Sequence, residues 1–129
     1  MAVAMIVLIP IGILAKEVVG RTRPIIPEDD FLIAPDEHYA FPSGHAHLVA
    51  AGAAVMLVLF RGTYRNLIVS IGLTVEAALV CFSRVYVGGH FPLDVVGGIL
   101  LGVGVAFLFV AASRPIDRIM QTVARALKR

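Results

Sequence analysis

Four long apolar runs dominate this sequence and restrict the folds that it can adopt. They cover residues 2–15, 46–60, 67–82 and 95–112. A membrane-spanning helix needs about 20 apolar residues, or about 17 at the short end. The last three runs reach this length with their flanking residues, whereas the first, with about 14 residues, would extend only roughly 21 Å. The sequence therefore predicts an all-α, multi-pass transmembrane helical bundle with about four spans.

Composition supports this class and excludes others. The chain is 59% hydrophobic and 16% charged, whereas about a quarter of the residues in soluble domains are charged. A net charge of +2 gives no basis for a nucleic-acid partner. Cys81 is the only cysteine and lies within an apolar run, so we expect a packed thiol and no intrachain disulfide.

The distribution of charge predicts the orientation in the cell membrane. Basic residues in short loops mark the cytoplasmic side, and here they flank the connection near residues 61–65 and crowd the C-terminus. The segments 16–45 and 83–94 would then share the extracytoplasmic face. The first of these segments also carries five acidic residues, namely Glu28, Asp29, Asp30, Asp36 and Glu37. We predict a core over residues 1–115 and a basic cytoplasmic tail over 116–129, either an amphipathic helix or a frayed end.

Three polar clusters lie at the edges of the apolar runs, all on the predicted extracytoplasmic side. They are Lys16 with Arg23-Pro24, then Pro42-Ser43-Gly44-His45, then Ser83-Arg84 with Gly88, His90 and Asp94. Phosphoryl transfer spreads negative charge over phosphate oxygens, and enzymes stabilise it mainly by positioned cations and hydrogen-bond donors. We assign the cations of these clusters to phosphate binding and interpret Arg21 as an ordinary cation at the membrane interface.

The second and third clusters also contain candidates for acid–base and nucleophilic chemistry. Ser43 is a natural N-cap, Gly44 admits a phosphate close to the backbone, and helix starts bind anions. His90 and Asp94 are four residues apart, so a carboxylate can hold one imidazole nitrogen while the other attacks. His45 is then the general acid. Zinc ligation is the competing reading, which basic neighbours oppose. Two further histidines, His38 and His47, are interpreted as structural or accessory.

Two features lie within the predicted spans. Glu76 is the one charge deep inside a span, where a functional role is the default hypothesis. We expect it to pair with an active-site cation, to be protonated, or to pair with another helix. A series of glycines in the last run predicts close helix packing, comprising Gly97, Gly98, Gly102 and Gly104.

Read in order, the patterns Lys-x6-Arg-Pro, Pro-Ser-Gly-His and Ser-Arg-x3-Gly-x-His-x3-Asp resemble the three-part signature of the type 2 phosphatidic acid phosphatase (PAP2) superfamily. The resemblance covers residues 16–94 and the helix after them. It implies that His90 attacks phosphorus to form a phosphohistidine, that Asp94 is its partner, and that His45 protonates the leaving group. Phosphate binding is implied for Lys16, Arg23, Ser43, Gly44 and Arg84. Neither a metal ion nor another cofactor is implied.

The resemblance also sets expectations for substrate and completeness. Membrane members dephosphorylate lipid phosphates and diphosphates, so we expect hydrolysis of a polyprenyl diphosphate, or of phosphatidic acid or phosphatidylglycerol phosphate. Such members usually have about six spans, and two N-terminal helices are expected to be missing here. A non-catalytic, truncated membrane protein is therefore the alternative. The expected partners are the bilayer and its lipid substrate, with a second copy or partner helices left open.

Overall fold

The computed structural model describes residues 2–25, 39–59 and 62–127, and the side chains of 6–25, 39–58 and 62–112. Within these ranges helices are the only regular secondary structure and there is no strand, which confirms the predicted all-α class. The four helices are α1 (Ala2–Val19), α2 (Gly44–Leu59), α3 (Tyr64–Tyr86) and α4 (Pro92–Leu127). His38 and the five acidic residues of the predicted extracytoplasmic segment 16–45 lie outside the described residues.

Two of these helices are long and apolar enough to cross a membrane. They are α3 and the Pro92–Ala112 part of α4, with mean hydropathies of 1.8 and 2.6. Their exposed faces carry large apolar side chains, such as Leu79 and Leu100. Such faces are suited to contact with lipid, because their side chains are apolar and the helical backbone satisfies its own hydrogen bonds. Helix α2 is apolar but shorter, with 16 residues that extend roughly 24 Å.

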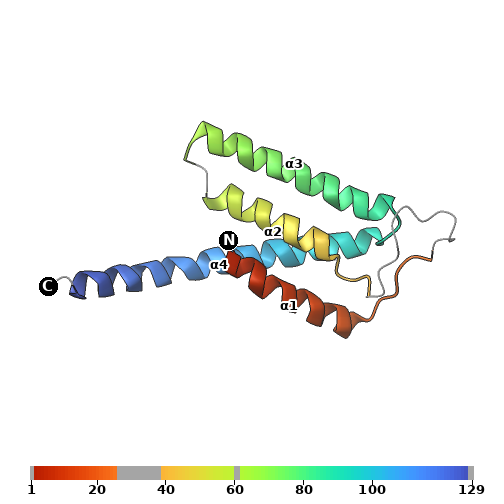
Figure 1. The fold of residues 1–129 in the computed structure, drawn as a ribbon, viewed down its shortest axis with the longest axis horizontal. Helices are drawn as coiled ribbons and strands as arrows, with labels where there is room; N and C mark the ends of the chain where they lie inside the picture. Colours follow the sequence, from red (N-terminus) through yellow and green to blue (C-terminus); the bar gives the residue numbers. More distant parts are fainter. Residues whose placement is uncertain (1, 26–38, 60–61, 128–129) are drawn as a thin grey trace.

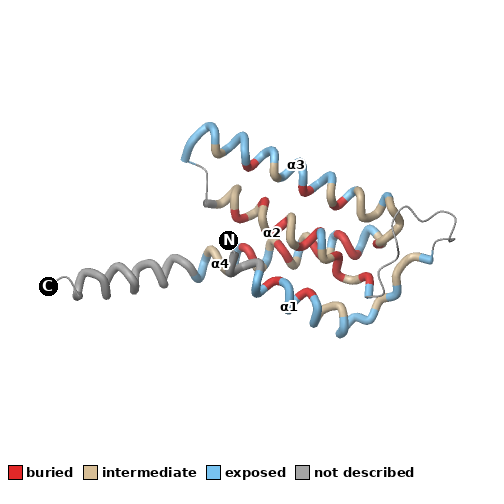
Figure 2. Tube along the Cα trace, in the orientation of Figure 1, coloured by how far each residue is buried: buried red, intermediate tan, exposed pale blue. Residues whose placement is uncertain are grey.

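Helix α2 lies at the centre of the bundle and packs against the other three helices (Figure 1). Its buried side chains are mostly alanines, and the buried residues of α1 and α4 face it (Figure 2). One core cluster joins Leu8 of α1 to Ala51 and Val55 of α2 and Ala106 of α4. Cys81 belongs to a second cluster between α2, α3 and α4, which confirms the predicted packed thiol.

Close approach of α4 to α2 depends on glycine. A Cβ atom added to Gly98 would lie 2.7 Å from the Ser43 carbonyl oxygen, and one added to Gly102 would overlap the His47 carbonyl group. Gly97 packs against the ring of Phe41 in the same way. The predicted glycine packing is confirmed at these three positions. It is wrong for Gly104, whose surroundings are open.

Helix α4 continues without a break through Pro115 to Leu127, a total of 36 residues (Figure 1). The backbone of the C-terminal segment is thus an extension of the last span. The side chains after residue 112 lie outside the described set, so the amphipathic character of 116–129, the domain division at 115 and the cytoplasmic position of the tail stay predictions.

Candidate active site

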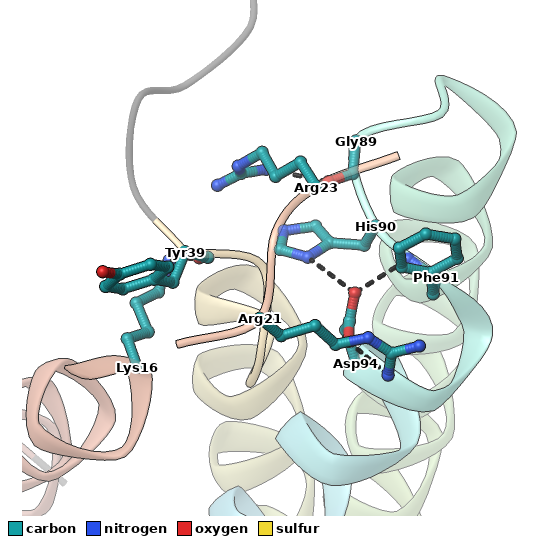
Figure 3. A network of polar contacts seen from close by, with 8 residues as sticks. All are labelled: Lys16, Arg21, Arg23, Tyr39, Gly89, His90, Phe91 and Asp94. Carbon is teal, nitrogen blue, oxygen red and sulfur yellow. Dashed lines mark hydrogen bonds and ion pairs between the residues drawn. The ribbon is translucent and has the colours of Figure 1, made fainter. Parts of the chain in front are cut away.

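Asp94 lies at the centre of a polar network at the end of the bundle where α1 and α3 finish and α2 and α4 begin (Figure 3). Pro92 opens α4, as the missing amide hydrogen of proline allows. The carboxylate then reaches back to accept a hydrogen bond from the Phe91 amide at 2.8 Å, as in a capping box. The Asp94 side chain is fully buried, so its carboxylate oxygens depend on partners within the protein to hold the side chain in this position.

The second carboxylate oxygen is held by Arg21. Its Nη1 atom lies 3.1 Å from Oδ1 of Asp94, and its guanidinium group covers the Phe91 ring at 4.6 Å from the centroid. The interpretation of Arg21 as an ordinary interface cation is therefore wrong. Sequence reasoning missed it because Arg21 occupies a variable position of the Lys-x6-Arg-Pro pattern, and only the fold brings the 20–25 segment against the start of α4.

His90 lies beside this carboxylate in the turn between α3 and α4. Its backbone amide donates to the Arg84 carbonyl group at 3.1 Å, in a turn where Gly88 has a φ of 71°. The Nδ1 atom is 3.8 Å from Oδ2 of Asp94, which is too long for a hydrogen bond. Catalytic hydrogen bonds are often long before substrate binds. The prediction that His90 and Asp94 lie next to each other is confirmed. The ring nitrogen nearest to the carboxylate is Nδ1, and the other ring nitrogen is Nε2.

The imidazole is held in its uncharged form. Burial lowers the pKa of His90 from 6.5 to about 4, and the positive charge of Arg23 adds to this effect. Asp94 and a backbone hydrogen bond with Ala40 act in the opposite direction but do not offset it. At neutral pH, the His90 ring is therefore uncharged.

The first cluster is tied to the other two by hydrogen bonds. Arg23 donates from Nη1 to the Gly89 carbonyl group at 2.8 Å, next to His90 (Figure 3). Lys16, in the last turn of α1, donates to the Tyr39 carbonyl group at 2.9 Å, just before the second cluster. These contacts place the predicted cations of the first cluster at the same end of the bundle as His90.

The second cluster meets the third through the backbone. The Ser43 amide donates to the Asp94 carbonyl group at 2.9 Å, and Ser43 directly precedes α2, which confirms its predicted position before the helix. Its hydroxyl group is buried and has no hydrogen-bond partner, so it does not cap the helix through its side chain. Gly44 has open space where a side chain would be. His45 is exposed on the first turn of α2.

The remaining candidates lie as follows. Arg84 is half-buried in the last turn of α3, and its Nε donates to the Ser83 hydroxyl at 3.3 Å. His47 is buried, and its ring packs against Gly12 of α1, in keeping with a structural role. Glu76 is exposed on α3 and has no hydrogen-bond or ion-pair partner among the described residues. The expected pairing of Glu76 with an active-site cation is thus not observed.

The site combines cationic side chains with two histidines. In the part of the chain that the structure describes, no group of three His, Cys, Asp or Glu side chains is placed to hold a metal ion. The carboxylate of Asp94 is already engaged by Arg21 and Phe91. Two buried polar atoms at the site, the Ser43 hydroxyl and Nδ1 of His90, have no hydrogen-bond partner. Such an arrangement suits an anion with several oxygens.

Comparison with known proteins agrees with this geometry. The family model of the PAP2 superfamily matches residues 1–117, and the chain therefore belongs to this superfamily. It is 37% identical over 125 residues to the undecaprenyl-diphosphatase of Sulfolobus acidocaldarius, covering 94% of this chain and 58% of that protein. It is 34% identical over 113 residues to phosphatidylglycerophosphatase B of Bacillus subtilis, covering 82% and 53% respectively.

The fold is also that of a solved membrane protein. The crystal structure of the transmembrane PAP2 type phosphatidylglycerolphosphate phosphatase from Bacillus subtilis superposes with a TM-score of 0.76 at 30% identity. The match covers 89% of this chain and 58% of that one. The chain thus spans a little over half the length of the relatives that it matches.

Proposed function

We propose that this chain hydrolyses a lipid phosphate or diphosphate without a metal ion, through a phosphohistidine on His90. The observation that carries this proposal is the state of His90, which is buried, neutral at physiological pH, and directed through Nδ1 at a fixed carboxylate. A short approach of Asp94 to Nδ1–H on substrate binding would fix the tautomer of the neutral imidazole and leave the Nε2 lone pair for attack.

In the first step, Nε2 of His90 attacks phosphorus, a P–N bond forms and the P–O bond to the lipid or its phosphate breaks. His45 gives its proton to the departing oxygen. The new positive charge on the His90 ring is stabilised by Asp94, which lies 3.8 Å away and needs only a small approach to accept a hydrogen bond.

In the second step, water attacks phosphorus and the P–N bond breaks. His45, now neutral, takes a proton from this water, and His90 recovers its lone pair as inorganic phosphate leaves. The two histidines therefore return to their starting states, and no oxidant or metal ion enters the balance.

The oxygens of the phosphoryl group need several donors in both steps. Lys16 and Arg23 from the first cluster and Arg84 from α3 supply positive charge at this end of the bundle. The partnerless hydroxyl of Ser43 and the open backbone at Gly44 supply neutral donors at the start of α2.

A polyprenyl diphosphate is the favoured substrate, because the chain is similar over 94% of its length to an undecaprenyl-diphosphatase. Phosphatidylglycerol phosphate or phosphatidic acid is the second candidate, favoured by the similarity to the Bacillus subtilis enzyme. We place the site at the extracytoplasmic face with the C-terminus in the cytoplasm, on the basis of the basic residues in the predicted cytoplasmic segments.

The test is phosphate release from a panel of lipid phosphates and diphosphates in detergent with a chelator present. Wild type is compared with His90→Gln and with Arg65→Ala, an exposed residue at the far end of α3 that serves as a control. Wild type and Arg65→Ala should release phosphate in the presence of chelator, be inhibited by vanadate and form an acid-labile phosphoenzyme. His90→Gln should neither release phosphate nor form the phosphoenzyme. No release from well-folded wild-type protein would favour the non-catalytic alternative.

A further inference from the structure

A cavity of about 400 Å³ lies between α2, α3 and α4, away from the polar network. Its walls include Ala50 and Ala53 of α2, Ala77 and Ala78 of α3, and Ile99 of α4. Helices α3 and α4 contact each other less than either contacts α2, so α2 forms the floor between them. The exposed side chain of Ala78 marks a side that opens to the surroundings of the bundle. We call this space the α2–α4 groove.

The chemistry of the groove suits hydrocarbon. Its only hydroxyl group belongs to Thr74, and this group donates to the Ser70 carbonyl at 2.8 Å, so it is already satisfied. The other walls are aliphatic or aromatic, apart from the thiol of Cys81. A polar ligand would lose its hydrogen bonds here, whereas an alkyl or isoprenoid chain would lose none.

The position of the groove relates it to the phosphate site. Cys81 comes three residues before Arg84, and Ile99 comes five residues after Asp94. The groove therefore begins roughly 5–8 Å along the helix axes from those residues. Its far end at Phe107 is 13 residues after Asp94, or roughly 20 Å. The groove thus follows the same helices whose ends form the site, and it leads down from them toward the middle of the predicted bilayer.

We infer that the α2–α4 groove holds the hydrocarbon chain of the lipid phosphate while its phosphoryl group lies at His90. This inference rests on the proposed function and adds a chain-binding site to it. The phosphate and the chain of such a lipid are joined covalently, so a chain in the groove would hold its phosphate near the ends of α3 and α4 that carry Arg84 and Asp94. The small alanine side chains that line the groove set its width, and Phe107 sets its length.

The width is tested with Ala78→Phe, which adds a ring at the exposed edge of the groove without entering the buried core. Val69→Phe on the same helix is the control, because Val69 is exposed and does not line the groove. The substrates are butyl phosphate and hexadecyl phosphate, which share a head group and differ in chain length. The added ring would occupy space that a long chain needs, so kcat/KM for hexadecyl phosphate should fall about tenfold, with butyl phosphate unchanged. Phe107→Ala should shift the preference toward longer chains.

Binding is measured separately from hydrolysis. Cys81 is buried, so the probe is Ala78→Cys in a Cys81→Ala background, which places an exposed thiol at the edge of the groove whose alkylation by N-ethylmaleimide reports occupancy. Hexadecyl phosphate should slow this reaction several-fold, and butyl phosphate should not. Equal effects of Ala78→Phe on both substrates, or no protection of the thiol introduced at position 78 by the long chain, would overturn the groove proposal. Protection without any phosphate release would instead leave the groove intact and refute the proposed hydrolysis.

Discussion

Arg21 provides a sharp test of the site, because it acts on His90 only through Asp94. The change is Arg21→Ala, which removes the partner of Oδ1 while the Phe91 amide still holds Oδ2. Asp94 is fully buried and the Arg21 side chain is 35% exposed. Breaking a fully buried pair costs about 3–5 kcal/mol and an exposed one about 0.2–1 kcal/mol.

An intermediate loss of about 2 kcal/mol is therefore expected for this half-exposed pair. Arg21 fixes the position of Asp94, so kcat/KM falls by up to roughly 30-fold if all of that loss falls on the alignment of Asp94 with His90 in the transition state. A second effect follows from charge. Without Arg21, the Asp94 carboxylate is less neutralised and favours protonated His90 more strongly, so the pKa of His90 should rise and the acid limb of the pH profile should move upward.

The assay is kcat/KM for the best lipid phosphate as a function of pH. Arg21→Lys should lie between wild type and Arg21→Ala, because it keeps the charge but loses the planar contact with Phe91. Arg65→Ala, which removes an exposed arginine elsewhere, is the control. An Arg21→Ala protein with normal kcat/KM and an unmoved acid limb would refute a positioning role for Arg21.

The remaining predictions concern protonation and packing. Because the pKa of His90 is about 4, kcat/KM should persist from neutral pH to roughly pH 5 and fall only below it, and an acid limb near 6.5 would contradict this. The native state binds fewer protons at His90 than the unfolded state between about pH 6.5 and 4, so stability should fall as the pH falls through that window, with His90→Gln showing a smaller fall in thermal unfolding. Gly102→Ala should destabilise the bundle by about 1–3 kcal/mol, since its methyl group would overlap the His47 carbonyl group. Gly104→Ala, with open surroundings, should unfold at or above the wild-type temperature. Equal unfolding temperatures for the two alanine variants would refute the close packing of α2 and α4.

Much of the helical architecture could be predicted from the sequence because it depends on local properties. Continuous apolar runs can satisfy their backbone only as helices in a membrane, and charges collect where those helices end. The packed thiol of Cys81 and the glycine contacts at Gly98 and Gly102 follow from the same logic. The prediction of close packing fails at Gly104, because the spacing of glycines along a helix does not show which of them meets a neighbouring helix.

The spacing of polar residues was equally informative about the site. His90 and Asp94 come together because only four residues separate them, across the turn that leads into α4. The topology of four helices then requires the ends that carry Lys16, Ser43 and Arg84 to lie on one side. For these residues, the local spacing and the order of the helices were sufficient to predict that they lie at one end of the bundle.

Other features depend on contacts between segments that are distant in the sequence. The pairing of Arg21 with Asp94 spans 73 positions and has no periodic signal. The low pKa of His90 depends on its burial and on the charge of Arg23, which is 67 positions away in the sequence. The α2–α4 groove exists because α3 and α4 both pack on α2 more closely than on each other. By itself, the amino-acid sequence determined the helices and the identity of the reacting groups, because these follow from short-range spacing and hydropathy. Only the tertiary structure decided their partners, their charge states and the shape of the apolar groove, because those depend on distances across the bundle.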